Sequence, residues 1–300
     1  MGKIRIAILG TGNIGSDLTE RLLRDPDFKV VAIVGRNKQS NGLERFKNRI
    51  PYVVSDGLIS FQKSLDLVDG FFDATSAESS KENWEFAQKN NKWFIDLTPS
   101  RIGTAFIPNI SGEVPGIEIS SEYSHNYSMV TCGGQSSAPV IHAMVSQMSK
   151  VKIVEVSSSI AANSAGIATR RNLDKYIETT EDLLIKISGS QSSKAILVLN
   201  PSSPEVPMRT TVTVRGAGAR LLEISDQVNL AVLKMQSVVP GYELVGDIQE
   251  VDRETYSATI RVSGAGYFLP RYAGNLDIIN AAAVATARMH ANFHSLSGAK

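Results

Sequence analysis

The chain has 300 residues, 42% of them hydrophobic and 20% charged, an ordinary composition for a globular protein. The formal net charge of +1 and the aromatic content of 7% give no support for nucleic acid or an acidic membrane surface as partners. No apolar run approaches the roughly 20 residues that cross a bilayer, and the one cysteine cannot form an intramolecular disulfide. We therefore expect a cytoplasmic protein, and its length predicts two domains.

The first third of the chain alternates short apolar runs with helical patterns. Strands are predicted at residues 4–9, 30–34, 70–74 and 93–97, and helices at 17–24 and 82–89. Apolar runs without alternation, separated by helices, indicate a parallel sheet covered on both faces. We predict an α/β fold in which residues 1–131 form a Rossmann-like dinucleotide-binding domain. An Ala-rich helix at 276–292 is expected to return and complete it.

After residue 132 the apolar residues alternate with polar ones. This pattern predicts strands at 151–160, 195–199, 211–214 and 256–262, with helices between them at 172–188 and 221–237. Alternation is typical of a mixed or antiparallel sheet with one exposed face. Residues 132–275 are therefore expected to form a second domain, a mixed sheet with helices on one face.

A glycine-rich turn follows the first predicted strand: Gly10, Thr11, Gly12, Asn13, Ile14 and Gly15. Its first glycine permits a tight turn, its second lets a pyrophosphate approach the backbone, and its third lets helix and strand pack closely. The following helix N-terminus offers N–H groups to the phosphates. Because the motif lies between a first strand and a first helix, it indicates a dinucleotide site.

The second predicted strand ends without the acidic residue that usually holds the ribose hydroxyl of NAD. Arg36, Lys38 and Ser40 stand there instead. They are suited to a 2′-phosphate, which favours NADP, or they are solvated loop residues. The cofactor is therefore left as NAD or NADP.

Cys132 is the only cysteine, and it precedes Gly133 and Gly134. A short apolar strand before it and a helical run over 139–148 after it predict a thiol at a helix N-terminus, which favours the thiolate. The glycines are expected to expose the sulfur and to supply N–H groups for an oxyanion. A thiol beside a nicotinamide predicts a thiohemiacetal, hydride transfer and a thioester whose acyl group passes to an acceptor. The alternative is a small buried hydrophobe.

The chain resembles the acylating acetaldehyde dehydrogenases nearly from end to end. The resemblance is carried by motifs in fixed order: GTGNIGSDL, FDATSA, IDLTPSRIG, MVTCGGQ, SAG, ETT, LNPSSP and LPRYAGNLDI. It implies oxidation of a short aldehyde to an acyl-coenzyme A, with coenzyme A as co-substrate, a homodimer and a partner aldolase. The resemblance implies, further, that residues 132–275 are an α+β catalytic and dimerisation domain. It also implies that Cys132 is the nucleophile, that 11–14 line the pyrophosphate, and that Ser164, Ala165, Gly166 and Asn275 approach the nicotinamide. Gln135, in the cysteine motif, is a further candidate catalytic residue.

The chain departs from the pattern of that family near the expected site. Thr210 stands where the family has an acid thought to act as a general base, and a hydroxyl cannot do that work near pH 7. Ser128 replaces an asparagine, and Tyr267 and Phe268 occupy the place of a usual histidine. Two alternatives therefore stay open: an NADP-dependent reductase of an acyl phosphate or carrier-bound acyl group, and a non-catalytic nucleotide-binding scaffold.

The remaining titratable residues give no metal-ligand spacing, so no metal is expected. His125 is a minor candidate base, His142 is expected on a helix about 15 Å from the thiol, and His290 and His294 are expected at the surface. Four acids lie inside resembling segments without a predicted place beside the thiol: Asp73, Glu78, Asp96 and Glu178. The two arginines Arg170 and Arg171 either bind a phosphate-bearing ligand such as coenzyme A or are solvated residues at the start of a helix.

Overall fold

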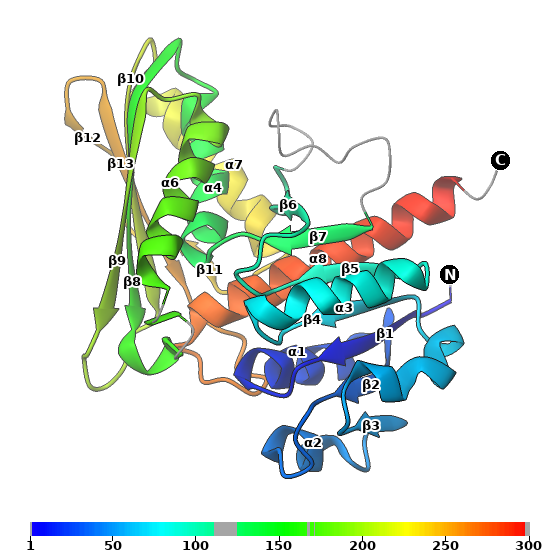
Figure 1. The fold of residues 1–300 in the computed structure, drawn as a ribbon. Coiled ribbons are helices and arrows are strands. Elements are labelled where there is room, and N and C mark those ends of the chain that lie inside the picture. The colour runs from blue at the N-terminus through cyan, green and yellow to red at the C-terminus, as the bar shows by residue number, and fades with distance from the viewer. Residues whose placement is uncertain (1, 111–124, 167–168, 171, 298–300) are drawn as a thin grey trace.

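The computed structural model describes residues 2–110, 125–166, 169–170 and 172–297. Two β-sheets stand at an angle to each other, with helices between them and around the first (Figure 1). This arrangement confirms the expected α/β fold with a parallel first sheet and a mixed second one.

The first sheet has seven strands, all parallel, in the order β3-β2-β1-β4-β5-β7-β6. Their bounds are β1 Ile4–Leu9, β2 Phe28–Val34, β3 Tyr52–Val54, β4 Gly70–Asp73, β5 Trp93–Asp96, β6 Thr104–Phe106 and β7 Asn126–Met129. The chain runs from β1 outward on one side and returns to β4 on the other. The carboxyl edge between β1 and β4 is therefore the switch point, where ligands bind in such sheets.

Both faces of this sheet are covered, as the apolar runs predicted. Along β1, Ile6 and Ile8 belong to one core, and Ala7 and Leu9 belong to another. The covering elements are α1 Asn13–Leu23, α2 Asn41–Phe46, the 3-10 segment η1 Leu58–Leu67 and α3 Ala77–Lys89. Helix α3 begins five residues before the expected start at 82, because Ser76 caps it by accepting the N–H of Ser79.

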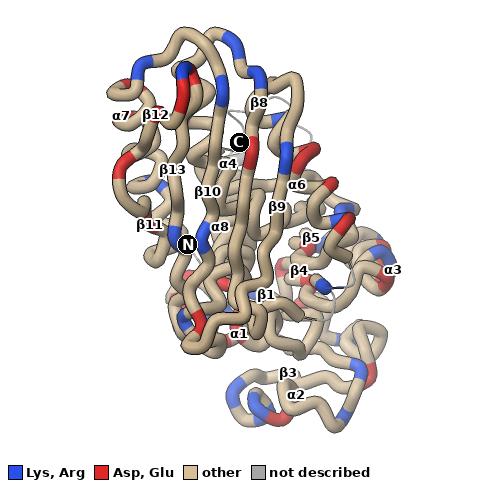
Figure 2. The backbone as a smooth tube through the Cα atoms, turned by 90° about the vertical axis from the view of Figure 1, so that its left-hand side faces the viewer, with Lys and Arg blue, Asp and Glu red and all other residues tan. Residues whose placement is uncertain are grey.

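The second sheet has six strands in the order β11-β13-β10-β8-β9, with β12 paired to β13. The bounds are β8 Lys150–Ala161, β9 Ser192–Asn200, β10 Met208–Ala217, β11 Tyr242–Leu244, β12 Gln249–Asp252 and β13 Thr255–Val262. Only β8 and β9 pair in parallel, so the sheet is mixed. Figure 2 looks onto the face of this sheet that turns away from the helices.

Helices α4 Cys132–Val145, α6 Leu173–Ser188 and α7 Leu221–Gln236 pack on the inner face of the second sheet. Helix α8, Gly274–Ser297, returns to the first sheet as expected but is longer than the predicted 276–292. One continuous apolar core joins both sheets through α4 and α8. Within the described residues, no helix is long and apolar enough to cross a membrane. The boundary between residues 131 and 132 stays a prediction.

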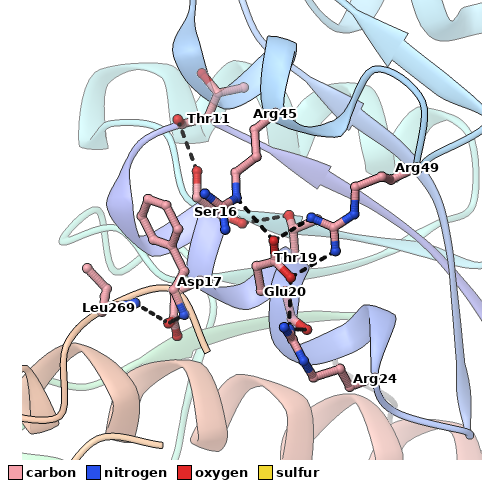
Figure 3. Close-up of polar contacts among 11 residues, drawn as sticks. Thr11, Ser16, Asp17, Thr19, Glu20, Arg24, Arg45, Arg49 and Leu269 are labelled. Carbon is pink, nitrogen blue, oxygen red and sulfur yellow. Dashed lines mark hydrogen bonds and ion pairs between the residues drawn. The ribbon is translucent and has the colours of Figure 1, made fainter. Parts of the chain in front are cut away.

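A buried ionic cluster ties α1 to α2 below the glycine-rich turn (Figure 3). Glu20 is 1% exposed and bonds three arginines: Arg49 at 2.5 and 2.9 Å, Arg24 at 2.8 Å and Arg45 at 3.1 Å. Hydrogen bonds from Arg49 above all lower the pKa of the Glu20 carboxyl to about 2.

Candidate active site

Cys132 is the first residue of α4, where the carboxyl end of β7 meets the helix. Its half-buried side chain lines a cavity of about 180 Å³. Most of the lining is apolar and includes Ile14, Leu97, Met129, Ile160 and Ile279. Arg101 and Lys175 also line it. The described residues of this lining include no carboxylate and no histidine.

The glycine-rich turn has the backbone that a dinucleotide needs. Gly10 adopts φ +99°, and an added Cβ there would lie 2.4 Å from the carbonyl oxygen of Ala74, so only glycine fits this turn. At Gly12, by contrast, a Cβ would meet nothing within 4 Å, and no side chain caps α1. The first N–H groups of α1 thus face open space, as a pyrophosphate requires.

The residues expected beside the nicotinamide also lie close to Cys132. Ile14 from the turn and Asn275 from α8 line the same cavity as Cys132. Asn275 is 4% exposed, and its Oδ1 has no hydrogen-bond partner among the described residues. A buried acceptor of this kind suits the amide of a nicotinamide. The structure therefore brings together three of the residues expected at the site, and they come from both ends of the chain.

The loop after β2 lies against the glycine-rich turn. The Oγ1 of Thr11 and the Oγ of Ser40 are 2.7 Å apart. Arg36 is exposed, and Lys38 pairs with Asp56 at 3.6 Å in an exposed position. The Ser40 hydroxyl and the cations Arg36 and Lys38 thus lie in the loop beside the end of β2, where the ribose of a dinucleotide lies in such folds.

Tyr176, from the first turn of α6, contacts the nucleophile. Its hydroxyl accepts the N–H of Gly133 at 2.8 Å and lies 3.4 Å from the Sγ of Cys132. The Oγ1 of Thr131 caps α4 by accepting the N–H of Gly134 and is 2.8 Å from the Oγ1 of Thr180. The chain thereby surrounds the start of α4 with hydroxyl groups.

The pKa of the Cys132 thiol is raised above its ordinary value, because burial disfavours the charged form. Hydrogen bonds from Tyr176 and from the N–H groups of Gly133 and Cys132 act in the opposite direction. The N–H groups at the start of α4 thus favour the thiolate, as expected, but burial outweighs them.

The two glycines after Cys132 have a different role from the expected one. A Cβ at Gly133 would lie 2.5 Å from the Tyr176 hydroxyl, and one at Gly134 would lie 2.6 Å from Leu183. Their N–H groups already have acceptors in Tyr176 and Thr131. The glycines thus let α6 approach α4 closely and do not leave two free N–H groups for an oxyanion.

Thr210, the residue in place of the family acid, lies in a buried cluster of hydroxyls behind the start of α4. Its Oγ1 is 2.8 Å from the Oγ of Ser136 and 3.1 Å from the Oγ of Ser158. Thr210 is 0% exposed and does not line the cavity. The Oγ of Ser128, another departure, accepts the N–H of Gly103 and donates to Asp96.

Several expected site residues do not line the cavity. Gln135 is fully buried, and its Nε2 donates to the carbonyl of Phe106, so it ties α4 to β6. Ser164 donates to the carbonyl of Ala161, Ala165 is buried, and Gly166 is exposed. The guanidinium of Arg170 donates to the carbonyls of Ala162 and Ala165, whereas residue 171 lies outside the described residues.

The histidines and acids lie elsewhere too. His125 is at the opposite end of β7 from Cys132 and contacts His290. His290 is 4% exposed, with its Nδ1 3.1 Å from the Tyr127 hydroxyl, so the expected surface position is wrong. It is buried because α8 packs on the first sheet there. The side chain of His294 lies outside the described part, and His142 is half-buried on α4.

Asp73 and Asp96 are buried at the ends of β4 and β5, and burial raises the pKa of both carboxyls. They are held by nearby hydroxyls, Thr75 and Ser100 respectively, and neither lines the cavity. Glu178 pairs with Lys175 in an exposed position. Among the described residues, no three His, Cys, Asp or Glu side chains gather as a metal site requires.

Sequence reasoning missed Tyr176, since the contact joins residues 44 positions apart. A weak signal existed: Tyr176 lies in the helix that contains the ETT motif, four residues before Thr180, so both face the same side.

Comparisons with known proteins agree with this geometry. Residues 5–102 match the family described as semialdehyde dehydrogenase, NAD binding domain, and residues 132–270 match that described as prokaryotic acetaldehyde dehydrogenase, dimerisation. A crystal structure of aspartate semialdehyde dehydrogenase II from Vibrio cholerae has a TM-score of 0.63 over 96% of this chain and 98% of its own, at 12% identity. This likeness shows the fold.

Whole-chain relatives are more similar. The acetaldehyde dehydrogenase of Pectobacterium atrosepticum is 40% identical over 96% of this chain and 95% of its own length. That of Spirochaeta aurantia is 41% identical over the same shares. These matches confirm the expected class, a nicotinamide-dependent aldehyde dehydrogenase. The chain belongs to the acetaldehyde dehydrogenase family.

Proposed function

We propose that the chain oxidises a short aldehyde to an acyl-coenzyme A, with Cys132 as the nucleophile. The observation that carries this proposal is the cavity itself. It joins the single thiol, the end of the glycine-rich turn and the buried acceptor of Asn275, and its small apolar lining suits a short carbon chain.

The residues of the chain perform the covalent part of this reaction. The Cys132 thiolate attacks the carbonyl carbon, so that an S–C bond forms and the carbonyl π electrons move to oxygen. A nicotinamide held beside Ile14 and Asn275 would supply the acceptor for the hydride of that carbon. As the hydride leaves, the oxygen electrons re-form the C=O bond, which gives a thioester on Cys132. Coenzyme A, whose thiol has given its proton to solvent, attacks this thioester as a thiolate; its S–C bond forms, the bond from carbon to Cys132 breaks, and Cys132 leaves as a thiolate.

Arg101 and Lys175 support an anionic acyl acceptor such as coenzyme A, because both line the cavity and both are exposed to solvent. Arg36, Lys38 and Ser40 support acceptance of NADP. Replacement of Arg36 by Ala is expected to raise KM for NADP about tenfold and to leave KM for NAD nearly unchanged. Equal effects on both cofactors would remove the 2′-phosphate role.

The test follows nucleotide reduction at 340 nm with C2 to C6 aldehydes, NAD or NADP, and with or without coenzyme A. Cys132→Ala is the control. We expect turnover that depends on coenzyme A and is lost in the control. Turnover without coenzyme A, or turnover of an acyl phosphate alone, favours the reductase alternative. Nucleotide binding without turnover favours the scaffold alternative.

We also infer a homodimer formed through the open face of the second sheet (Figure 2). That face exposes Ile153, Ile196 and Val198 beside a row of Ser and Thr, including a Thr211–Thr259 contact at 2.9 Å. Such a mixed flat face is suited to a second copy. Ile196→Glu should give a monomer in light scattering, and a wild-type monomer would contradict the inference. The partner aldolase and the cytoplasmic location stay predictions from resemblance and composition.

A further inference from the structure

The hydroxyl of Tyr176 is the one side-chain group that the structure places in hydrogen-bond contact with the Cys132 sulfur within the described residues. The first turn of α6 carries it into the cavity. The contact depends on Gly133, since a Cβ there would lie 2.5 Å from the hydroxyl oxygen. The chain thus uses glycine at that position to admit this phenol.

The direction of the hydrogen bonds follows from their partners. The N–H of Gly133 donates to the Tyr176 oxygen at 2.8 Å, which leaves the proton of the phenol available. The Cys132 sulfur lies within reach at 3.4 Å, and the Thr131 side chain is a second polar neighbour of the phenol. A thiolate has no proton, so once Cys132 is ionised the tyrosine must be the donor. The N–H of Gly133, in the first turn of α4, therefore polarises the phenol toward the sulfur.

We infer that Tyr176 is a catalytic residue. Its hydroxyl donates the hydrogen bond that stabilises the Cys132 thiolate, both before attack on the aldehyde and when the sulfur leaves the thioester. The inference rests on the proposed role of Cys132 as the nucleophile. Hydrogen bonds to an ionised partner are stronger than neutral ones, so this contact strengthens when the negative charge forms.

Tyr176 acts here as a donor and not as a base. Burial, followed by the neighbouring Cys132, raises the pKa of its phenol well above the ordinary value. It therefore keeps its proton at neutral pH. A hydrogen-bond donor is also what this thiol needs, because burial raises its pKa and so disfavours the thiolate.

Other charges near the sulfur have to be separated from this effect. The ionisable groups around it in the described lining are Arg101, from the loop after β5, and Lys175 and Tyr176, from α6. The lining residues from α1, β7, β8 and α8 are not ionisable: Ile14, Met129, Ile160, Asn275, Leu276 and Ile279. Arg101 and Lys175 are exposed, so salt screens them, whereas the Tyr176 contact persists.

The test measures the rate of Cys132 alkylation by iodoacetamide against pH, at low and high salt. In Tyr176→Phe, which keeps the ring, we expect the midpoint of the profile to rise by about one pH unit at both salt concentrations. The second-order turnover constant, kcat/KM, is expected to fall about tenfold near pH 7. The matched control is Tyr256→Phe on β13, outside the cavity. The Tyr256 hydroxyl donates to the carbonyl of Ala219, and its removal should leave the profile unchanged.

An unchanged alkylation midpoint in a folded Tyr176→Phe protein would overturn the inference, even if turnover fell. So would a shift that disappears at high salt, because the cations would then explain it. Cys132→Ala separates this result from the proposed function. If that variant still turns over aldehyde, the nucleophile is elsewhere and the proposed function fails, whereas the effect of Tyr176 on the thiol is still read from alkylation.

Discussion

Two polar clusters among the described residues, one around Glu20 and one around the start of α4, are built in opposite ways. Around Glu20, three arginines surround one carboxylate that is 1% exposed. Around the start of α4, the groups are hydroxyls: Thr131, Ser136, Ser158, Tyr176, Thr180 and Thr210. The first cluster joins two helices through full charges. The second surrounds a thiol with neutral donors and acceptors.

The difference shows how each cluster responds to pH. The Glu20 cluster is already charged, and its arginines hold it so down to pH about 2. In the hydroxyl cluster, burial raises the pKa of both the Cys132 thiol and the Tyr176 phenol, so a thiolate that forms there is met by donors that stay neutral. A permanently charged neighbour would cost desolvation in the resting enzyme. Hydrogen bonds that neutral groups donate to the Cys132 sulfur, by contrast, stabilise it mainly when it is ionised.

Gly133→Ala should give the largest effect on the hydroxyl cluster. The new Cβ would lie 2.5 Å from the Tyr176 hydroxyl and 3.0 Å from the Ser158 oxygen, so the phenol must move away from the sulfur. We expect turnover to fall about 100-fold, as displacement of a group by about 1 Å can cause. Steady-state kinetics with the best aldehyde measures it.

The matched background for this change is Tyr176→Phe. Without the hydroxyl, the nearest atom of that ring is Cζ, 3.5 Å from the new Cβ, which is ordinary contact. Gly133→Ala should therefore lower the melting temperature less in that background than in the wild type. An equal loss in both backgrounds would mean that the phenol is not what the glycine admits.

Glu20→Gln tests the ionic cluster. Removal of the charge leaves Arg24, Arg45 and Arg49 close together, and we expect a loss of about 2 kcal/mol in the free energy of unfolding at neutral pH. Because the folded pKa of Glu20 is lowered from 4.5 to about 2, its contribution is complete above pH 4.5 and disappears as the pH falls toward 2. Urea unfolding over this range measures the difference.

The control on the same helix pair is Glu44→Gln, since Glu44 pairs with Lys47 at 3.5 Å in an exposed position. Exposed pairs contribute little, so this variant should unfold almost like the wild type. A difference between Glu20→Gln and wild type that stays constant from pH 4.5 to 2 would show that shape, and not charge, explains the loss.

The secondary structure shows which elements could be predicted from the sequence and which could not. The apolar runs predicted β1, β2, β4 and β5 because both faces of the parallel sheet are buried. The three-residue strands β3 and β6 have no periodicity to detect. Pro139 was interpreted as the start of a helix, but α4 begins at Cys132, where the Thr131 side chain supplies a cap.

The site was predictable in its reactive group and not in its surroundings. Cys132 and the glycine-rich turn stand out because their chemistry lies in a few consecutive residues. Tyr176 and Thr210 reach the start of α4 from other elements, 44 and 78 positions along the chain from Cys132. The two glycines were interpreted as exposing the sulfur, but they admit α6. Only tertiary packing decides between these two roles.

Thr210→Val should give the smallest effect and the clearest contrast with Glu20. The change keeps the shape and removes the hydroxyl, so Ser136 and Ser158 lose a buried partner. We expect a loss of about 1 kcal/mol in the free energy of unfolding that does not vary between pH 4.5 and 2, because none of the three hydroxyls titrates there. Turnover should largely remain, since Thr210 does not line the cavity. The control is Ser237→Ala, whose exposed hydroxyl donates to the carbonyl of Lys234, an acceptor that solvent can reach. If Thr210→Val instead abolishes turnover while folding normally, the Thr210 hydroxyl takes part in the reaction, and the neutral donors that act on the thiol include Thr210 as well as Tyr176.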